Sequence, residues 1–449
     1  MRSRGRTLGC RTWRVPVAIA AVLLAISACT VAPARAPATT PAVPPNIQAV
    51  AREVSITGPD GSSLDGDERR AVVGRVVRQG RSELMKTQLA AMASNGDVDL
   101  YAGNAVRLLI DGPKTFEAMF NAIRSARHSI YLESYIVEDA NIAQELAELL
   151  RANGVKVCKF NPLNPLERPG YWGISHRDHR KILVVDEAIG FTGGINISSV
   201  YSTGSMRSSH RSRVSPQNEQ GWRDTQMEIR GPAARALSEL LRETWRAQGC
   251  SETLRPMPDA ASARAAGPQL VRIVPASPED ESNRIYTLLL GSIDAAEHSV
   301  YMTMAYFAPG EEMLDALCRA ARRGVSVKLI LPSKSDFTPV LHAGRANYAR
   351  LLEAGVEVHE LQIAVLHAKT AVIDGVVSTV GSSNMDWRSF SSNNEVNAVV
   401  MGEDFGGIMT KVFERDLTMS QPIDAATWAQ RPLLQRMKET LFGLFERLW

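Results

Sequence analysis

Short β-branched runs alternate along this chain with amphipathic segments whose apolar positions recur at helical spacing. A first copy of this pattern predicts a strand, a helix and a strand, at 104–110, 115–126 and 129–135. A second copy repeats the order, at 269–274, 284–296 and 299–306. Strands separated by helices are typical of a mostly parallel sheet with helices on its faces. The sequence therefore predicts an α/β fold: two repeated α/β units, with mostly parallel sheets, packed around one shared active site.

The two copies differ in length after these elements. The second copy continues with a helix, a strand, a helix and a strand, at 313–323, 325–331, 343–354 and 356–361. The first copy continues with only a helix at 142–152 and a strand at 155–160, before a stretch containing proline and glycine at 161–173. We expect one helix–strand unit to be absent from the first half.

An eight-residue pattern then occurs in both copies, as H-R-K-I-L-V-V-D at 179–186 and H-A-K-T-A-V-I-D at 367–374. With 8 histidines in 449 residues and ordinary usage of lysine and aspartate, about 0.02 matches to H-x-K-x4-D are expected by chance. Each copy reads as a buried strand. Alternation along a strand places His179 with Lys181, and His367 with Lys369, on one face.

Further polar residues stand at matching places after each pattern. A glycine-containing turn ends at Asn196 in the first half and at Asn384 in the second. An acid then leads into a strand and a helix, Asp224 in one half and Glu395 in the other.

Two histidines, two lysines and two asparagines from paired half-sites suit a reaction at a phosphodiester. One neutral imidazole can attack phosphorus to form a phosphohistidine, while the other, protonated, gives a proton to the leaving alkoxide. The lysines supply positive charge, and the asparagines donate hydrogen bonds, where the non-bridging oxygens gain negative charge. This chemistry needs no metal and no cofactor, and no carboxylate cluster in the sequence is spaced to bind a metal ion.

A histidine in this role needs its second ring nitrogen held, which fixes the tautomer. From their matching places in the repeat, we expect Asp224 to orient His179 and Glu395 to orient His367. The aspartates that close the two patterns fall at strand ends, where both catalysis and a structural ion pair are open interpretations: Asp186 and Asp374.

The N-terminus has the layout of a signal peptide. Five arginines precede an apolar run at 15–26 that is too short to span a bilayer, and small residues then lead to Cys29. The residues before Cys29 resemble a bacterial lipoprotein signal, which predicts a signal peptide at 1–28 and a lipidated Cys29. Plain secretion and an uncleaved anchor are the alternatives. A Pro- and Ala-rich tether is expected at 29–48, and Thr30 resembles sorting to the outer membrane, so we expect a lipid-anchored protein on the periplasmic side of a bacterial envelope.

Removing this segment changes the charge and cysteine arguments. The five arginines of residues 1–28 account for more than the net charge of +3, and the mature chain carries −2. No global basic charge favours a nucleic-acid partner. Three further cysteines match no metal motif and allow at most one disulfide within the chain: Cys158, Cys250 and Cys318.

We assign the first half to 49–250, a polar linker to 251–268 and the second half to 269–449. The second half ends in a segment, 428–449, that is amphipathic at helical spacing and contains several cations. Docking on the core and contact with a membrane surface are both compatible with that pattern.

Five stretches around the two patterns resemble the phospholipase D superfamily, and bacterial cardiolipin synthases in particular: 130–135, 191–196, 222–225, 305–309 and 381–389. The resemblance covers residues 104 to 445. It implies transfer of a phosphatidyl group through a phosphohistidine, with His179 as nucleophile and His367 as general acid. Phospholipids, phosphatidylglycerol above all, are the implied substrates, cardiolipin the implied product, and a membrane surface the implied partner.

Three alternatives stay open at this point. Water in place of an alcohol would make the protein a phospholipase D that releases phosphatidic acid. A periplasmic nuclease would use the same scaffold, although the charge of the mature chain disfavours it. The absent helix–strand unit also leaves open an envelope lipid-binding protein that has lost catalysis.

Overall fold

The computed structural model describes residues 54–79, 84–87, 89, 99–138, 141–151, 158, 160, 176–205, 221–250, 254–257, 265–280 and 282–448. The expected signal peptide, Cys29 and the tether lie outside the described residues, as does most of the predicted strand at 155–160 and of the linker at 251–268.

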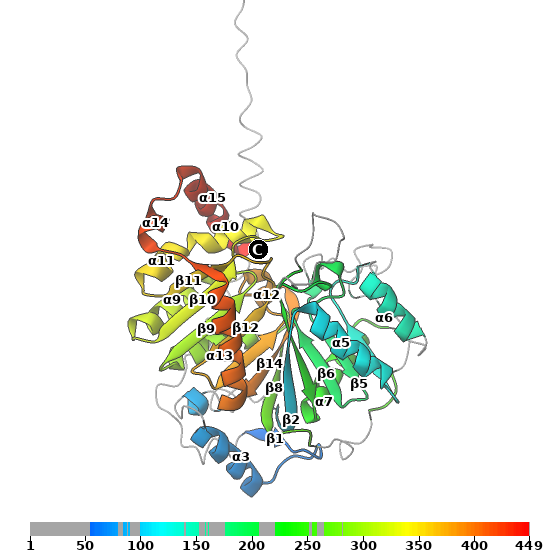
Figure 1. Cartoon of the computed structure of the whole chain (residues 1–449). Coiled ribbons are helices and arrows are strands. Elements are labelled where there is room, and N and C mark those ends of the chain that lie inside the picture. The colour runs from blue at the N-terminus through cyan, green and yellow to red at the C-terminus, as the bar shows by residue number, and fades with distance from the viewer. Residues whose placement is uncertain are drawn as a thin grey trace, which may run out of the picture. The chain divides into compact units, whose positions relative to one another are not determined.

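A continuous path of hydrogen-bonded strands runs through both halves (Figure 1). The second half contributes, from the outer edge inward, β15 (Ser420–Pro422), β11 (Glu357–Leu361), β10 (Ser326–Pro332), β9 (Ser299–Met304), β12 (Lys369–Ile373), β13 (Val377–Gly381), β14 (Asn393–Met401) and β8 (Gln269–Ala276). The first half continues outward with β2 (Asp99–Ile110), β7 (Thr225–Arg230), β6 (Ile189–Gly193), β5 (Ile182–Val185) and β3 (Ile130–Glu133). Two short strands lie beside this path, β1 (Ser55–Thr57) on β2 and β4 (Arg177–Asp178) on β14.

The two halves are joined through β2. Its first residues pair with β8, and its residues from Ala105 onward pair with β7. The change of partner falls at an irregularity that contains Gly103, whose φ of +86° favours glycine. Strand β6 then lies against β13 and β14, and a buried apolar cluster fills the space between the halves. Both repeats therefore share this cluster, and each half also has a buried apolar cluster of its own.

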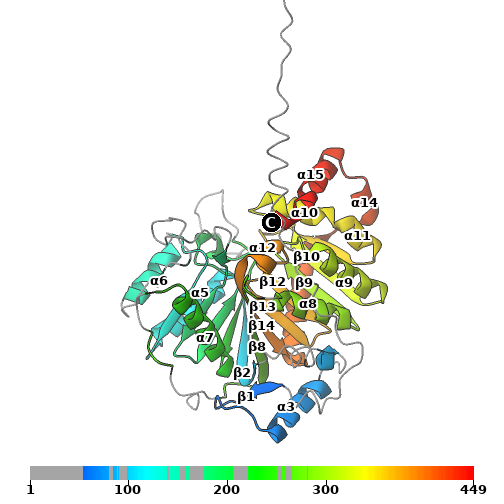
Figure 2. The same cartoon turned by 180° about the vertical axis from the view of Figure 1, so that it is seen from behind.

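Helices cover both faces of the sheets. In the first half these are α5 (Asp111–Arg124), α6 (Asn141–Arg151) and α7 (Pro232–Ala247), and α3 (Gly66–Gln79) precedes them. In the second half they are α8 (Arg284–Ala295), α9 (Gly310–Arg322), α10 (Thr338–Ala346), α11 (Tyr348–Glu353), α12 (Trp387–Ser391), α13 (Glu403–Thr418), α14 (Ala425–Ala429) and α15 (Leu433–Leu444). Helices α5 and α13 face the viewer in Figure 1, whereas α7, α8 and α9 do so in the reverse view of Figure 2. No helix in the described ranges is both long enough and apolar enough to cross a bilayer.

The α/β class and the doubled unit are confirmed, but strand direction differs from the expectation of mostly parallel sheets. Among the described strands, parallel neighbours are β9 with β10, β10 with β11, β1 with β2 and β4 with β14. The middle of each half is antiparallel. The reason is local: three residues join β5 to β6 and β12 to β13, and so short a connection can reach only an antiparallel neighbour.

The halves are unequal, as the sequence predicts. Between β9 and β12 the second half has α9, β10, α10, α11 and β11. Between β3 and β5 the described part of the first half has only α6 and the two-residue β4, and the path of strands ends at β3.

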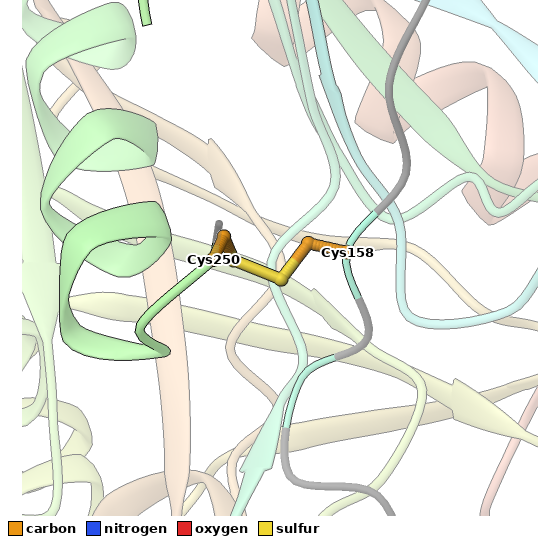
Figure 3. The surroundings of a disulfide bond; sticks show 2 residues. All are labelled: Cys158 and Cys250. Atoms are coloured by element: carbon orange, nitrogen blue, oxygen red, sulfur yellow. A yellow bond between two sulfur atoms is a disulfide. The ribbon is translucent and has the colours of Figure 1, made fainter. Parts of the chain in front are cut away.

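A disulfide joins Cys158, a few residues beyond α6, to Cys250 at the end of α7 (Figure 3). The two Cα atoms are 6.0 Å apart and the cysteines are 92 positions apart in sequence. Cys318 is free and buried. The expectation of at most one disulfide is confirmed, and the bond ties Cys158 to the chain just after α7.

Breaking this bond should destabilise the first half. Because a cross-link over so long a loop restricts the unfolded chain, Cys158→Ser with Cys250→Ser should lower the free energy of unfolding by about 2–5 kcal/mol. Urea denaturation measures the difference. A reductant should lower the stability of the wild-type protein to the same value and leave the double variant unchanged; equal stability of the oxidised wild type and the variant would contradict the prediction.

Candidate active site

Each histidine of the repeated pattern is held by the backbone of the other half. In the first half, β4 pairs with β14, and the amide of His179 donates to the carbonyl of Asn394 over 2.9 Å. In the second half, Leu366 forms a bridge with Arg223, and the amide of His367 donates to the carbonyl of Arg223 over 2.8 Å. Asn394 is followed directly by Glu395, and Arg223 by Asp224. Each histidine is therefore bonded to the residue that precedes the acid of the other half.

The acid–histidine pairs are therefore crossed. Nδ1 of His179 lies 2.9 and 3.1 Å from the two carboxylate oxygens of Glu395. Nδ1 of His367 lies 2.7 Å from Oδ2 of Asp224. This corrects the expectation that Asp224 orients His179 and Glu395 orients His367. The repeat gives both acids equivalent places, and only the pairing of the two halves decides which histidine each acid meets.

The crossed pairs fix the chemistry of the rings. An imidazole that donates from Nδ1 to a carboxylate carries its lone pair on Nε2, so Nε2 of each ring is the reactive nitrogen. His179 and His367 are both buried, as are Asp224 and Glu395. Neither half holds a complete unit of histidine and acid on its own.

The two lysines lie beside the histidines and are also buried. Nζ of Lys181 donates to the carbonyl of His179, and Nζ of Lys369 to the carbonyl of His367. Nζ of Lys369 also lies 2.9 Å from Nδ1 of His367. Burial and the neighbouring charge of the other lysine lower the pKa of Lys181 to about 7, against the attraction of Glu395. Burial lowers the pKa of Lys369 to about 8, against the attraction of Asp224 and Glu395.

The two acids respond differently to the same burial. Burial raises the pKa of Asp224 to about 6, against the charges of Lys369 and other cations. Burial would also raise the pKa of Glu395, but the attraction and hydrogen bond of His179, and the charge of Lys181, hold it below its usual value. The carboxylate that meets His179 is thus the more fully ionised of the two.

Burial lowers the pKa of both histidines. For His179 the charge of Glu395 opposes the effect of burial. For His367 the charges of Lys369, Lys181 and His179 add to it, so its pKa falls well below the usual value. Each ring thus feels charges from both halves, and the two half-sites form one electrostatic unit.

The two asparagines are buried at the same end of the sheets. The side-chain oxygen of Asn196 accepts a hydrogen bond from the Ile136 amide over 3.3 Å, and its side chain also bonds Tyr201, which contacts His367. The backbone amide of Asn384 donates to the hydroxyl of Ser389 over 3.1 Å, and its side-chain oxygen has no hydrogen-bond partner among the described residues. Their location is compatible with the expected role, in which their side-chain amides donate hydrogen bonds to phosphate oxygens. That role stays a prediction.

The two pattern aspartates do not belong to the site. The carboxylate of Asp186 accepts hydrogen bonds from the amides of residues 127, 128 and 129, over 2.8, 2.7 and 2.8 Å. Asp374 accepts from the amides of residues 297, 298 and 299 in the same way, over 2.9, 2.7 and 2.7 Å. Both sit in hairpin turns with positive φ. Asp186 holds the loop before β3 in place, and Asp374 holds the loop before β9. This role replaces the two that the sequence left open for these aspartates, catalysis and a structural ion pair.

Aromatic side chains around the histidines were not predicted from the sequence. The ring of Tyr135 meets His179 edge-on, with centroids 4.9 Å apart. The buried hydroxyl of Tyr201 lies 3.1 Å from Nδ1 of His367, and the rings of Trp222 and Tyr306 lie 5.4 and 6.5 Å from that of His367. Tyr201 and Trp222 come from the first half, so they strengthen the crossed arrangement. Tyr201 and Trp222 are close in sequence to Asn196 and Asp224, and three of the four aromatic residues lie in stretches that resemble the family: Tyr135, Trp222 and Tyr306.

Two further polar residues support the acids. The hydroxyl of Ser382 donates to Glu395 over 2.5 Å. The guanidinium of Arg223 is buried, forms an ion pair with Asp416 and donates to the carbonyl of Asp224 over 2.5 Å. Arg223 precedes Asp224 directly in the chain and lies in a stretch, 222–225, that resembles the family, but neither fact indicated its contact with Asp416.

Comparison with known proteins agrees with this geometry. A family model described as "Cardiolipin synthase, PLD-like domain" matches residues 289–417. A protein named cardiolipin synthase from Geobacillus thermodenitrificans (strain NG80-2) is 32% identical over 394 residues, which cover 80% of this chain and 75% of that protein. A protein named cardiolipin synthase A from Pseudomonas aeruginosa (strain LESB58) is 34% identical over 71% of this chain and 68% of its own length.

A solved structure shares the fold. The crystal structure of phosphatidylserine synthase from Haemophilus influenzae Rd KW20 aligns with a TM-score of 0.55 and 12% identity, over 77% of this chain and 95% of that one.

Proposed function

Because the chain belongs to the cardiolipin synthase family of phospholipase D-like proteins, we propose that it transfers phosphatidyl groups between phospholipid phosphodiesters. The donor and acceptor in this proposal are two molecules of phosphatidylglycerol, and the products are cardiolipin and glycerol. One observation carries the proposal: two buried histidines, each oriented by an acid from the opposite half, stand with two lysines in one site.

In the first step, Nε2 of His179 attacks the phosphorus of one phosphatidylglycerol. A P–N bond forms and the P–O bond to glycerol breaks. His367 is protonated once the bound phosphodiester anion offsets the charges of the two lysines that lower its pKa, and its Nε2–H gives the proton to the departing oxygen. His179 is the better nucleophile because Glu395 holds its Nδ1 with both oxygens and stays ionised. Glu395 therefore stabilises the positive charge that His179 gains.

In the second step, His367 acts as a base. It takes the proton from a hydroxyl of the second phosphatidylglycerol, whose oxygen attacks phosphorus as the P–N bond breaks. Lys181 and Lys369 offset the negative charge on the non-bridging oxygens in both steps. The phosphohistidine exists only between the steps, and water in place of the second lipid would release phosphatidic acid.

The lysines give the reaction a pH dependence. The charged form of a lysine is lost as pH rises through its pKa, so the pKa of about 7 for Lys181 and about 8 for Lys369 predict a fall in kcat/KM between these values. A kinetic profile from pH 5 to 10 tests this, with a Lys181→Arg variant beside the wild type. A guanidinium stays charged, so the variant should move the alkaline fall upward; a wild-type profile that stays flat to pH 9 would contradict the assignment.

We also place the enzyme in the cell envelope, anchored by a lipid on Cys29 and facing the periplasm. The Cys158–Cys250 disulfide supports this, because such bonds persist in exported proteins and are rare in the cytosol. A Cys29→Ala variant should no longer incorporate a labelled fatty acid, whereas the wild type should, and the variant should keep the disulfide.

Product analysis tests the proposed function. Purified protein and vesicles of phosphatidylglycerol should yield cardiolipin and glycerol in equal amounts, read by mass spectrometry. Phosphatidic acid alone would make the protein a hydrolase, and cleavage of single-stranded DNA without lipid turnover would make it a nuclease. Lipid turnover that survives His179→Ala unchanged would mean that this site does not carry the activity.

A further inference from the structure

Helix α15 is packed with its polar side inward. Glu439 is buried, and its carboxylate accepts hydrogen bonds from Arg431 over 2.7 Å and from Gln435 over 2.9 Å. The ring of Phe442 stacks on His342 of α10, with centroids 5.7 Å apart. A helix that docks on a core normally buries its apolar side. Helix α15 does dock on the rest of the protein, as the sequence allowed, but it does so with the side that carries Glu439 and not with its apolar side.

The apolar side of α15 faces outward instead. Six large apolar side chains are between 44% and 78% exposed: Leu433, Leu434, Met437, Leu441, Leu444 and Phe445. At 3.6 residues per turn these six positions fall within a sector of about 120° of the helix. We call these six residues the α15 face.

A second exposed apolar group lies in the first half, directly after β3. Tyr135, Ile136 and Val137 are 43%, 44% and 64% exposed. Besides these and the α15 face, the described residues have one other exposed large apolar side chain, Ile408 on α13. Exposed apolar surface is therefore concentrated in two places.

Both places adjoin the active site. Tyr135 itself meets His179, and Val137 forms a bridge with the residue that follows Asn196. The chain beyond α15 folds back on α9 and α12: Glu446 accepts from the amide of Gly310 at the start of α9, and the guanidinium of Arg447 lies 5.6 Å from the ring of Trp387 in α12. Phe442 packs in one apolar cluster with Tyr306, whose ring faces His367. In both Figure 1 and Figure 2, α15 lies at the end opposite β1 and α3, and α12 lies between α15 and those elements.

The charges around the α15 face are positive. Arg436, Lys438 and Arg447 are exposed, whereas Glu439 is buried and Glu446 is bonded to a backbone amide. Apolar side chains flanked by cations suit an anionic phospholipid surface, where the former enter the acyl region and the latter meet the head groups.

We propose that the α15 face, together with Tyr135, Ile136 and Val137, docks the protein on an anionic phospholipid bilayer and holds the active site against it. The choice of a bilayer as occupant rests on the proposed function, because the substrates are lipids of that surface. Docking at the rim lets a head group reach the histidines while its acyl chains remain in the membrane.

The test compares two variants, both in the chain from Thr30 onward, so that neither the signal peptide nor an acyl group on Cys29 supplies the binding. One carries Leu434→Gln, Leu441→Gln and Leu444→Gln. The control carries Ile408→Gln, which removes the exposed apolar side chain on α13, outside the α15 face. Because all four side chains are exposed, both variants should keep the melting temperature of the parent.

The parent and the Ile408→Gln control should sediment with phosphatidylglycerol vesicles and turn them over equally. The triple variant should bind these vesicles roughly 100-fold more weakly, because the apolar surface of three leucines is no longer transferred from water into the bilayer. Its turnover of phosphatidylglycerol in vesicles should fall in proportion to the loss of binding. Its turnover of dihexanoyl phosphatidylglycerol below the micelle concentration should equal that of the parent. A Val137→Gln variant should also bind the vesicles more weakly, which gives a second reading if the triple variant does not fold.

Unchanged vesicle binding by the triple variant would overturn the proposal. Equal loss on monomeric lipid would overturn it too, because the leucines would then act in the site. A parent dimer that the triple variant dissociates without lipid would assign the face to a second copy of the chain. If the parent binds vesicles through the leucines but does not turn over lipid, the docking surface is supported and the proposed function is wrong.

Discussion

Replacing either histidine with asparagine is expected to lower lipid turnover by about 10⁴-fold or more, which corresponds to about 5.5 kcal/mol of transition-state stabilisation. Asparagine keeps a hydrogen-bonding group near the position of Nδ1 but supplies neither a nucleophile nor an exchangeable proton. Because His179 and His367 act in one cycle, the double variant should be no slower than the slower single variant.

Turnover of phosphatidylglycerol by the purified variants measures the effect. Melting temperature and disulfide content of each variant serve as controls for folding. A single variant that keeps more than a tenth of the wild-type rate would show that its histidine takes no direct part in the reaction.

Replacing the acids should separate the two steps and test the crossed pairing. Glu395→Gln should lower turnover by about 10³–10⁴-fold, because a histidine that loses its carboxylate is left in the wrong tautomer. Asp224→Asn should have a similar effect on phosphatidylglycerol. Ser382→Ala, which removes one hydrogen bond from Glu395, should reproduce only a small part of the loss.

A p-nitrophenyl phosphodiester distinguishes the two acids. Its leaving group needs no proton, so loss of the general acid should hardly matter for the first burst of p-nitrophenolate. If Asp224 serves His367, Asp224→Asn should keep a burst of one equivalent, whereas Glu395→Gln should lose it because the nucleophile is disabled. The opposite pattern would restore the pairing expected from repeat position.

Much of the site followed from the sequence because its chemistry is local. The expected strands begin later than predicted, at Ile182 and Lys369, so His179, Lys181 and His367 lie in the chain that leads into β5 and β12. The spacing of two residues still brought each lysine beside its histidine, and the turn after each pattern located the asparagines. The crossed acids did not follow, because Asp224 and Glu395 occupy equivalent positions and only long-range pairing of β4 with β14 separates the two possibilities. An internal repeat predicts that each histidine pairs with an acid, but not whether that acid comes from the same half or from the other half.

The remaining differences have similar causes. Asp186 and Asp374 belong to the repeated pattern, yet their carboxylates bind amides of the preceding loop, which a strand pattern cannot reveal. Strand direction was set by the length of the turns, not by the hydrophobic periodicity. The segment at 428–449 was identified as amphipathic, but periodicity cannot say which face a helix buries, and α15 buries Glu439.

The central claim is that the two halves build one site in which His179 becomes covalently phosphorylated. The most direct measurement is a peptide map by mass spectrometry of the His367→Asn variant, quenched in base after reaction with a p-nitrophenyl phosphodiester. The first step needs no general acid with this substrate, and the missing base delays release, so the phosphoryl adduct should accumulate on His179. Absence of any adduct, or an adduct on a residue other than His179, would contradict the account.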